Sequence, residues 1–208
     1  MFRFDARKLA TLQSAISTEK MRPYLNGVFF DGCRAVATDG HIMTIAHGEY
    51  NNGDHNEAPV YIDKQTFTML RKNSACFAEI DDAGIIRIYD KHGFVEHVGQ
   101  APTIDGRFPD YRRVLPSNVR DHTATAFSHL VLNRIIQTAK VLAGGSHGCG
   151  LTILGNGDDD GGPNLVRYSG HPDVVTLIMP MSEAHACYDW PDWLTDHPQA
   201  TLPAPAAA

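Results

Sequence analysis

A pattern of elements recurs three times along the chain and restricts the folds that it can adopt. In each copy, a strand-like run precedes a helix, and three further strand-like runs follow it. The helices are predicted to begin at Asp5, Asp63 and Ser128, whose side chains can accept hydrogen bonds from the free N–H groups of a first helical turn. Apolar residues follow each cap at the fourth and seventh positions, as expected for one face of an amphipathic helix.

The runs around these helices are rich in β-branched and aromatic residues and end at turn residues, which predicts strands. One strand is expected before each helix, at residues 2–4, 60–62 and 125–127. Three are expected after each helix, at residues 24–30, 34–38 and 42–47, at 77–80, 85–89 and 94–98, and at 151–154, 165–168 and 174–179. The repeated unit is therefore βαβββ and about 60 residues long. A chance recurrence of a common capped helix is the alternative explanation.

One unit cannot cover both its helix and its sheet, so units are expected to pair. We predict an α+β domain of two units at 1–103, an ordered connector at 104–119, a third unit that is half a domain at 120–182, and a mostly disordered tail at 183–208. The connector is too rich in Pro and Gly for a helix and too mixed in polarity for a regular strand. It carries Phe108, Tyr111 and three arginines, whereas ordinary linkers are small and polar. We therefore expect a strap that lies between two packed bodies.

Composition limits the class of protein. A chain of 208 residues, 43% of them hydrophobic, can bury one sizeable core or two small ones. Its formal charge of −6 does not indicate general affinity for nucleic acid. The four cysteines are far apart and form no Cys-x-x-Cys pair, which fits reduced thiols better than two disulfides. Without a signal-peptide core or an apolar run near the ~20 residues of a membrane span, we expect a soluble, cytoplasmic protein.

Four motifs resemble one protein family, the bacterial DNA polymerase III β subunit or β sliding clamp. They are the run from Arg22 to Phe30, the run from Val36 to His41, the strap, and the run from Ile178 to Met181. They occur in the family's order over about residues 20–182, and match the clamp's middle domain and its C-terminal end. The resemblance implies the DNA-clamp (processivity-fold) architecture, a ring of βαβββ units with helices around the DNA. This chain has three units where a clamp subunit has six.

The resemblance also implies a pocket in which clamps bind short linear peptides of their partners. Carried over by position, its residues are Arg22, Leu25, Thr38, Gly40, His41, Ile42, Met43, Pro109, Arg113, Val114, Leu177, Ile178, Met179, Pro180 and Met181. Leu, Val, Ile and Met suit an adaptable apolar cavity, and arginines at its rim can bind peptide carbonyls or acids. The sequence departs from the family at Ile42, where clamps have a basic residue, and after Met181, where clamps end.

Each of these residues also has a plainer interpretation. Met179 and Met181 could be core residues, and His41 a turn residue without a ligand. Arg112 and Arg113 could be a solvated pair, or could stack on Phe108 or Tyr111. The basic residues Arg7, Lys8, Arg71, Lys72, Arg134 and Lys140 lie on or beside the three helices. By resemblance they would face double-stranded DNA and contact phosphates; the alternative is that they are ordinary solvated helix faces.

Catalysis finds no support in the sequence. His41 and His47 lack the spacing of a metal site, and the glycine- and aspartate-rich run at 155–162 lacks the spaced ligands of a calcium loop. The glycine-rich run at 144–150 follows a helix, whereas phosphate loops precede one. We expect no enzyme activity, no cofactor and no metal. In the tail, Trp190 and Trp193 could pack on the sheet or compete for the pocket.

We therefore expect a clamp-like accessory protein of DNA replication. Its partners would be DNA polymerase and clamp-loader type proteins, bound through short linear peptides, and it would encircle double-stranded DNA as a homo-oligomer. No membrane contact is expected. The alternative is an adaptor or decoy that forms no ring and binds replication proteins without DNA.

Overall fold

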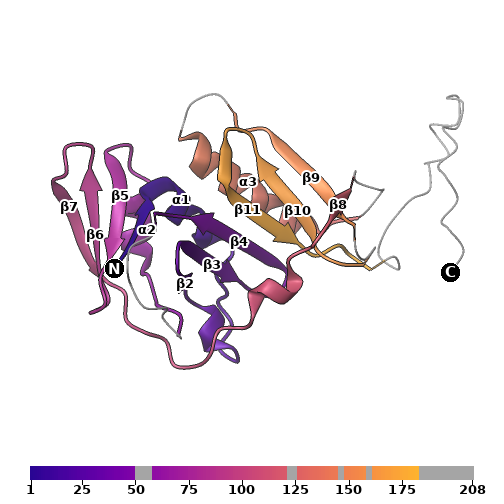
Figure 1. The fold of residues 1–208 in the computed structure, drawn as a ribbon, viewed down its shortest axis with the longest axis horizontal. Coiled ribbons are helices and arrows are strands. Elements are labelled where there is room, and N and C mark those ends of the chain that lie inside the picture. The colour runs from indigo at the N-terminus through magenta and orange to yellow at the C-terminus, as the bar shows by residue number, and fades with distance from the viewer. Residues whose placement is uncertain (50–57, 121–125, 145–147, 158–160, 183–208) are drawn as a thin grey trace, which may run out of the picture.

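The structure, a computed structural model, describes residues 1–49, 58–120, 126–144, 148–157 and 161–182, and the predicted tail lies outside them. It contains two antiparallel sheets (Figure 1). The strands are β1 (Phe2–Asp5), β2 (Phe29–Asp31), β3 (Arg34–Thr38), β4 (Ile42–His47), β5 (Ala75–Ile80), β6 (Ile85–Asp90), β7 (Val95–Gln100), β8 (Val119–Arg120), β9 (Leu151–Asn156), β10 (Asn164–Tyr168) and β11 (His171–Ile178). The four-stranded sheet has the order β1-β5-β6-β7, and the seven-stranded sheet β2-β3-β4-β11-β10-β9-β8.

The three predicted helix caps are confirmed. Asp5 caps α1 (Ala6–Thr11), Asp63 caps α2 (Lys64–Leu70) and Ser128 caps α3 (His129–Ala143), each accepting hydrogen bonds from N–H groups of the first turn. Helix α1 contacts both α2 and α3. The apolar faces of all three helices pack into one core with the inner faces of both sheets, so the pattern of caps and apolar residues predicts the helices correctly.

Several predicted elements differ from those observed. The first part of the expected strand 24–30 is a 3-10 helix, η2 (Pro23–Leu25), because Pro23 has no N–H for a strand ladder and suits the first position of a helix. Only Val60 of the expected strand 60–62 forms bridges, to Val28 and Thr103. Residues 126 and 127 form no strand; the third unit's first strand is β8, earlier in the chain. The connector also contains a short 3-10 helix, η3 (Tyr111–Val114).

The first strands of the units pair in two different ways. In the first two units they are exchanged, because β1 pairs with β5 of the second unit and Val60 bridges to Val28 of the first. In the third unit, β8 pairs with β9 of its own unit. The third unit joins the first through β11 and β4, in a register that runs from Val174 opposite Ala46 to Ile178 opposite Ile42. This pairing makes the seven-stranded sheet continuous.

Alternation along β4 and β11 divides their side chains between two cores. Ile42, Ala46, Val174 and Ile178 face the helices and belong to the main core. Met43, Ile45 and Leu177 face the opposite side. There they form a second cluster with Leu25 of η2, Val36 of β3 and the strap residues Phe108 and Tyr111. The strap therefore covers the face of the sheet that the helices leave free.

Candidate functional site

A cavity of about 230 Å³ lies where the β3–β4 turn, the strap and the end of β11 meet. Its lining includes eleven of the fifteen residues expected at a peptide pocket: Arg22, Leu25, Thr38, Gly40, His41, Ile42, Met43, Pro109, Val114, Leu177 and Met179. Tyr24, Asp110, Tyr111 and Pro163 complete it. The structure thus gathers residues from the first unit, the connector and the third unit around one cavity, which we call the pocket.

The base of the pocket is apolar and its rim is partly apolar as well. Met43 and Leu177 lie opposite each other in the β4–β11 register, and both are buried with Leu25 in the second cluster. At the rim, Val114 is 48% and Met179 39% exposed. The alternative that Met179 is a core residue does not fit this exposure. Exposed apolar side chains above a buried apolar base provide a surface that a ligand's apolar side chains can cover.

Aromatic and polar contacts fix the strap wall of the pocket to β2. The ring of Phe108 stacks on Phe29 with 4.8 Å between ring centroids and an angle of 4° between their planes. The hydroxyl of Tyr111 donates a hydrogen bond of 2.7 Å to Asp31, which also forms an ion pair with Arg112. Burial raises the pKa of Tyr111, so its phenol stays protonated and able to donate this bond. The strap wall is therefore attached to β2 through Phe108 and Tyr111.

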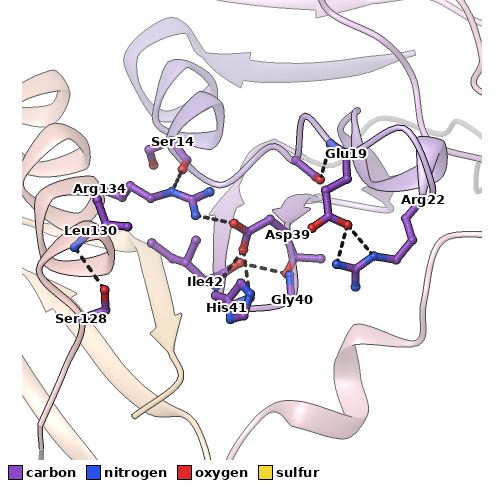
Figure 2. A network of polar contacts seen from close by, with 12 residues as sticks. Ser14, Glu19, Arg22, Asp39, Gly40, His41, Ile42, Ser128, Leu130 and Arg134 are labelled. Atoms are coloured by element: carbon purple, nitrogen blue, oxygen red, sulfur yellow. Dashed lines mark hydrogen bonds and ion pairs between the residues drawn. The ribbon is translucent and has the colours of Figure 1, made fainter. Parts of the chain in front are cut away.

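The β3–β4 turn forms the opposite wall and is held by its own side chains (Figure 2). Asp39 Oδ1 accepts hydrogen bonds from the backbone N–H groups of His41 (2.9 Å) and Ile42 (3.1 Å). The hydroxyl of Thr38 accepts one from the Gly40 N–H (3.1 Å) and donates one to the Ile42 carbonyl (2.8 Å). Gly40 has φ +95°, a conformation that favours glycine.

Helix α3 reaches this turn through Arg134. Its guanidinium pairs with Asp39 Oδ2 and donates a second hydrogen bond to the Ser14 carbonyl, as Figure 2 shows. Burial alone raises the pKa of the Asp39 carboxyl, but hydrogen bonds from Arg134 and from the His41 and Ile42 N–H groups outweigh burial and hold that pKa below its ordinary value. Asp39 is therefore charged at neutral pH and connects the turn to α3.

Four predicted pocket residues do not line the cavity. Ile178 points into the main core because of the strand alternation, and Arg113 is exposed on η3. Pro180 and Met181 lie just beyond β11, where the Met181 N–H donates to the Ala126 carbonyl (2.8 Å). Of the lining residues that were not predicted, Tyr24, Asp110 and Tyr111 are neighbours of predicted ones. Pro163 lies between β9 and β10, and no motif indicates it.

The six predicted DNA-facing residues fall into two groups. Three are engaged: Lys8 forms an ion pair with Asp173 (2.6 Å), Arg7 donates to Asn73 (3.1 Å), and Arg134 binds Asp39 and Ser14. The others, Arg71, Lys72 and Lys140, are exposed on or just after their helices. No Asp or Glu occurs within α1, α2 or α3, although the chain contains 24 acidic residues. Among the described residues, acidic side chains therefore lie outside these three helices.

The described residues contain neither a candidate metal site nor a candidate membrane span. Among these residues, no group of three or more His, Cys, Asp or Glu side chains could hold a metal ion. In the same ranges, no helix has both the length and the apolar character needed to cross a membrane.

Sequence comparison relates the chain to one kind of protein, although no family model matches it. It is 33% identical over 110 residues to the β sliding clamp of Caulobacter vibrioides (strain NA1000 / CB15N), which is 49% of this chain and 30% of the relative. It is 31% identical over 125 residues to the clamp of Vibrio cholerae, and 28% over 124 residues to that of Escherichia coli K12, covering 57% and 56% of this chain. The matches span about a third of the length of these relatives, 33% and 32% in the last two.

Structure comparison extends the similarity to most of the chain. DNA polymerase III subunit β from Borrelia burgdorferi, solved in complex with a natural product, has a TM-score of 0.57 at 14% identity, over 88% of this chain and 65% of that one. A DNA polymerase sliding clamp from Pseudomonas aeruginosa has a TM-score of 0.55 at 20% identity, over 86% and 65%. The similarity to sliding clamps agrees with the prediction that this protein is not an enzyme. The chain therefore has the fold of the bacterial β sliding clamp over most of its length, and its sequence is similar to that of the clamp over about half of its length.

Proposed function

We propose that this protein is a clamp-like accessory of DNA replication, which binds short linear peptides of polymerase and clamp-loader type proteins in the pocket. The observation that carries the proposal is the pocket itself, with its apolar base and exposed apolar rim at the meeting point of the turn, the strap and β11. Its volume of about 230 Å³ is smaller than the roughly 300–1,000 Å³ of small-molecule sites, and suits a few side chains of a peptide.

Peptide binding is tested with a fluorescein-labelled decapeptide that has Leu and Phe anchors, by fluorescence polarisation. Met179→Ala removes exposed apolar surface from the rim and is expected to weaken binding by about 1–2 kcal/mol, roughly five- to thirtyfold. Leu130→Ala is the matched control, because Leu130 is also exposed but lies on α3 outside the pocket lining. If wild type, Met179→Ala and Leu130→Ala bind the decapeptide with equal affinity, the peptide binds outside the pocket.

A second pair of variants tests the turn. Gly40→Ala forces alanine into a positive φ and brings its Cβ to 3.4 Å from Arg22, at the pocket rim. Gly93→Ala introduces the same type of strain at φ +83°, with no atom within 4 Å of the new Cβ. Both are expected to cost about 1 kcal/mol of stability. Only Gly40→Ala is expected to weaken peptide binding; a loss of affinity in both would show that the effect is global.

We also propose domains at 1–103 and 120–182, joined by a connector at 104–119, and an oligomer that encircles double-stranded DNA. The absence of acidic residues from the three helices supports a phosphate-facing surface that includes Arg71, Lys72 and Lys140. The edge strand β7 supports association, because it carries the exposed residues Val95 and Val98, next to Phe94.

One observation favours the alternative, an adaptor or decoy without a ring. In the third unit, β8 pairs with the last two residues of β9 of its own unit, so part of this sheet edge is occupied without a second half-domain. Light scattering across a concentration series distinguishes the two. A stable closed assembly supports the ring, and a monomer at all concentrations supports the adaptor.

A further inference from the structure

We infer that Arg134 is a positioning residue for the pocket: through its contact with Asp39, it holds the β3–β4 turn in the shape that binds peptide. This inference rests on the proposed function of the pocket. It identifies a contact between two units that lies outside the pocket lining and controls one of its walls.

The carboxylate of Asp39 divides its two oxygens between the turn and the helix. Oδ1 accepts from the N–H groups of His41 and Ile42, and Oδ2 pairs with Arg134. Arg134 and Asp39 are 25% and 18% exposed, so water screens the pair only in part. Removing Arg134 leaves a largely buried carboxylate without its cation, and the carboxylate must turn toward water. That rotation breaks the two bonds that shape the turn.

The turn carries Gly40, His41 and Ile42 of the pocket lining, and it is fastened to the facing strand. The Met179 N–H donates a hydrogen bond of 3.0 Å to the His41 carbonyl, so a displaced His41 also moves Met179 at the rim. The remaining wall, formed by the strap, is held independently through Phe108 and Tyr111. Loss of Arg134 therefore displaces the turn wall, and Met179 with it, while the strap wall stays in place.

The geometry requires arginine at this position. Nε of Arg134 donates to the Ser14 carbonyl while Nη1 binds Asp39, so one planar group spans two acceptors. A lysine has a single charged nitrogen and cannot reproduce that pair of directed bonds. We therefore expect Arg134→Lys to restore only part of the function lost in Arg134→Gln.

A double-mutant cycle tests the inference with the labelled decapeptide. Arg134→Gln and Asp39→Asn are each expected to weaken binding about tenfold, and the double variant no more than about tenfold, because the residues act through one contact. Lys64→Gln removes an exposed helical charge outside the network and controls for net charge. Ser14→Ala removes a second tie of α3, the 2.7 Å hydroxyl bond to Thr138, and keeps the Ser14 carbonyl. Both controls should bind like wild type.

Backbone NMR separates this inference from the proposed function. The ¹H–¹⁵N signals of His41 and Ile42 are expected to shift in Arg134→Gln and to move part of the way back in Arg134→Lys, in the absence of peptide. If wild type binds no peptide but these signals shift, the proposed function fails and the positioning contact stands. If wild type binds peptide and Arg134→Gln binds it equally well with unshifted signals, the inference is wrong. Additive losses in the cycle would also overturn it.

Discussion

Replacing Thr176 by valine should destabilise the protein, and a second replacement should restore it. Thr176 on β11 lies opposite Thr44 on β4, and both are fully buried. Their hydroxyl groups are 3.1 Å apart, and Thr176 also bonds the Tyr168 hydroxyl at 2.8 Å. Valine has the shape of threonine but no hydroxyl. Thr176→Val therefore leaves the buried Thr44 hydroxyl without this partner, whereas Tyr168 keeps a hydrogen bond to Thr138.

A buried hydroxyl that loses its partner costs about 1–3 kcal/mol, which is the expected loss for Thr176→Val. For a chain of this size, the corresponding fall in Tm is about 2–12 °C. Thr44→Val/Thr176→Val removes both hydroxyls. Its free energy of unfolding is expected to lie within about 1 kcal/mol of that of wild type, because neither hydroxyl is left without its partner. The free energy of unfolding is measured by urea denaturation followed by circular dichroism.

The exposed Thr68 of α2 provides the control, since Thr68→Val changes the same atoms at the surface. The reasoning is refuted if Thr176→Val is as stable as Thr68→Val. It is also refuted if the double variant loses the sum of the two single losses. Either result would mean that the hydroxyl pair contributes nothing specific to the joint between β4 and β11.

Two further predictions concern the walls of the pocket. Phe108→Ala removes a buried ring stacked on Phe29, so it should lower the free energy of unfolding by about 3–5 kcal/mol in urea denaturation and weaken peptide binding. Phe94→Ala removes an exposed ring and should change neither quantity. Equal losses in both variants would contradict the strap as a pocket wall. The pKa of Asp39 is lowered in the folded protein from its ordinary value of 3.8, so its contribution to stability is present above that value and is lost as pH falls through the folded pKa. With Arg134, Arg22 and His41 as the charged or titratable neighbours of this carboxylate, the stability of Asp39→Asn should fall less between pH 5 and 2 than that of wild type, and parallel acid denaturation curves would contradict this.

The local parts of the fold could be predicted from the sequence because they depend on neighbouring residues. A capping side chain and the apolar positions that follow it lie within one or two helical turns, so Asp5, Asp63 and Ser128 identify their helices. The strands of the hairpins follow from alternation and turn residues. The run Val36 to His41 and the strap each supply several residues that line the cavity, because neighbouring residues of a motif reach it together.

The remaining features depend on contacts between distant segments. Arg134 and Asp39 are 95 positions apart, and an arginine on an amphipathic helix looks the same whether it faces phosphate or a carboxylate. The position of β8 depends on which residues reach the edge of β9, and Ala126 and Phe127 form no strand although the run that contains them has strand propensity. Pro163 lines the pocket only because β10 places it there.

The central claim is that partner peptides bind in the pocket, and a spin-labelled peptide tests it most directly. The decapeptide carries a nitroxide at one end, and paramagnetic broadening of backbone ¹H–¹⁵N signals is recorded across the protein. We predict that broadening centres on His41, Val114 and Met179, and that signals of the β7 edge, such as Val98, stay sharp. Broadening centred on β7, or uniform weak broadening without a centre, would contradict the account.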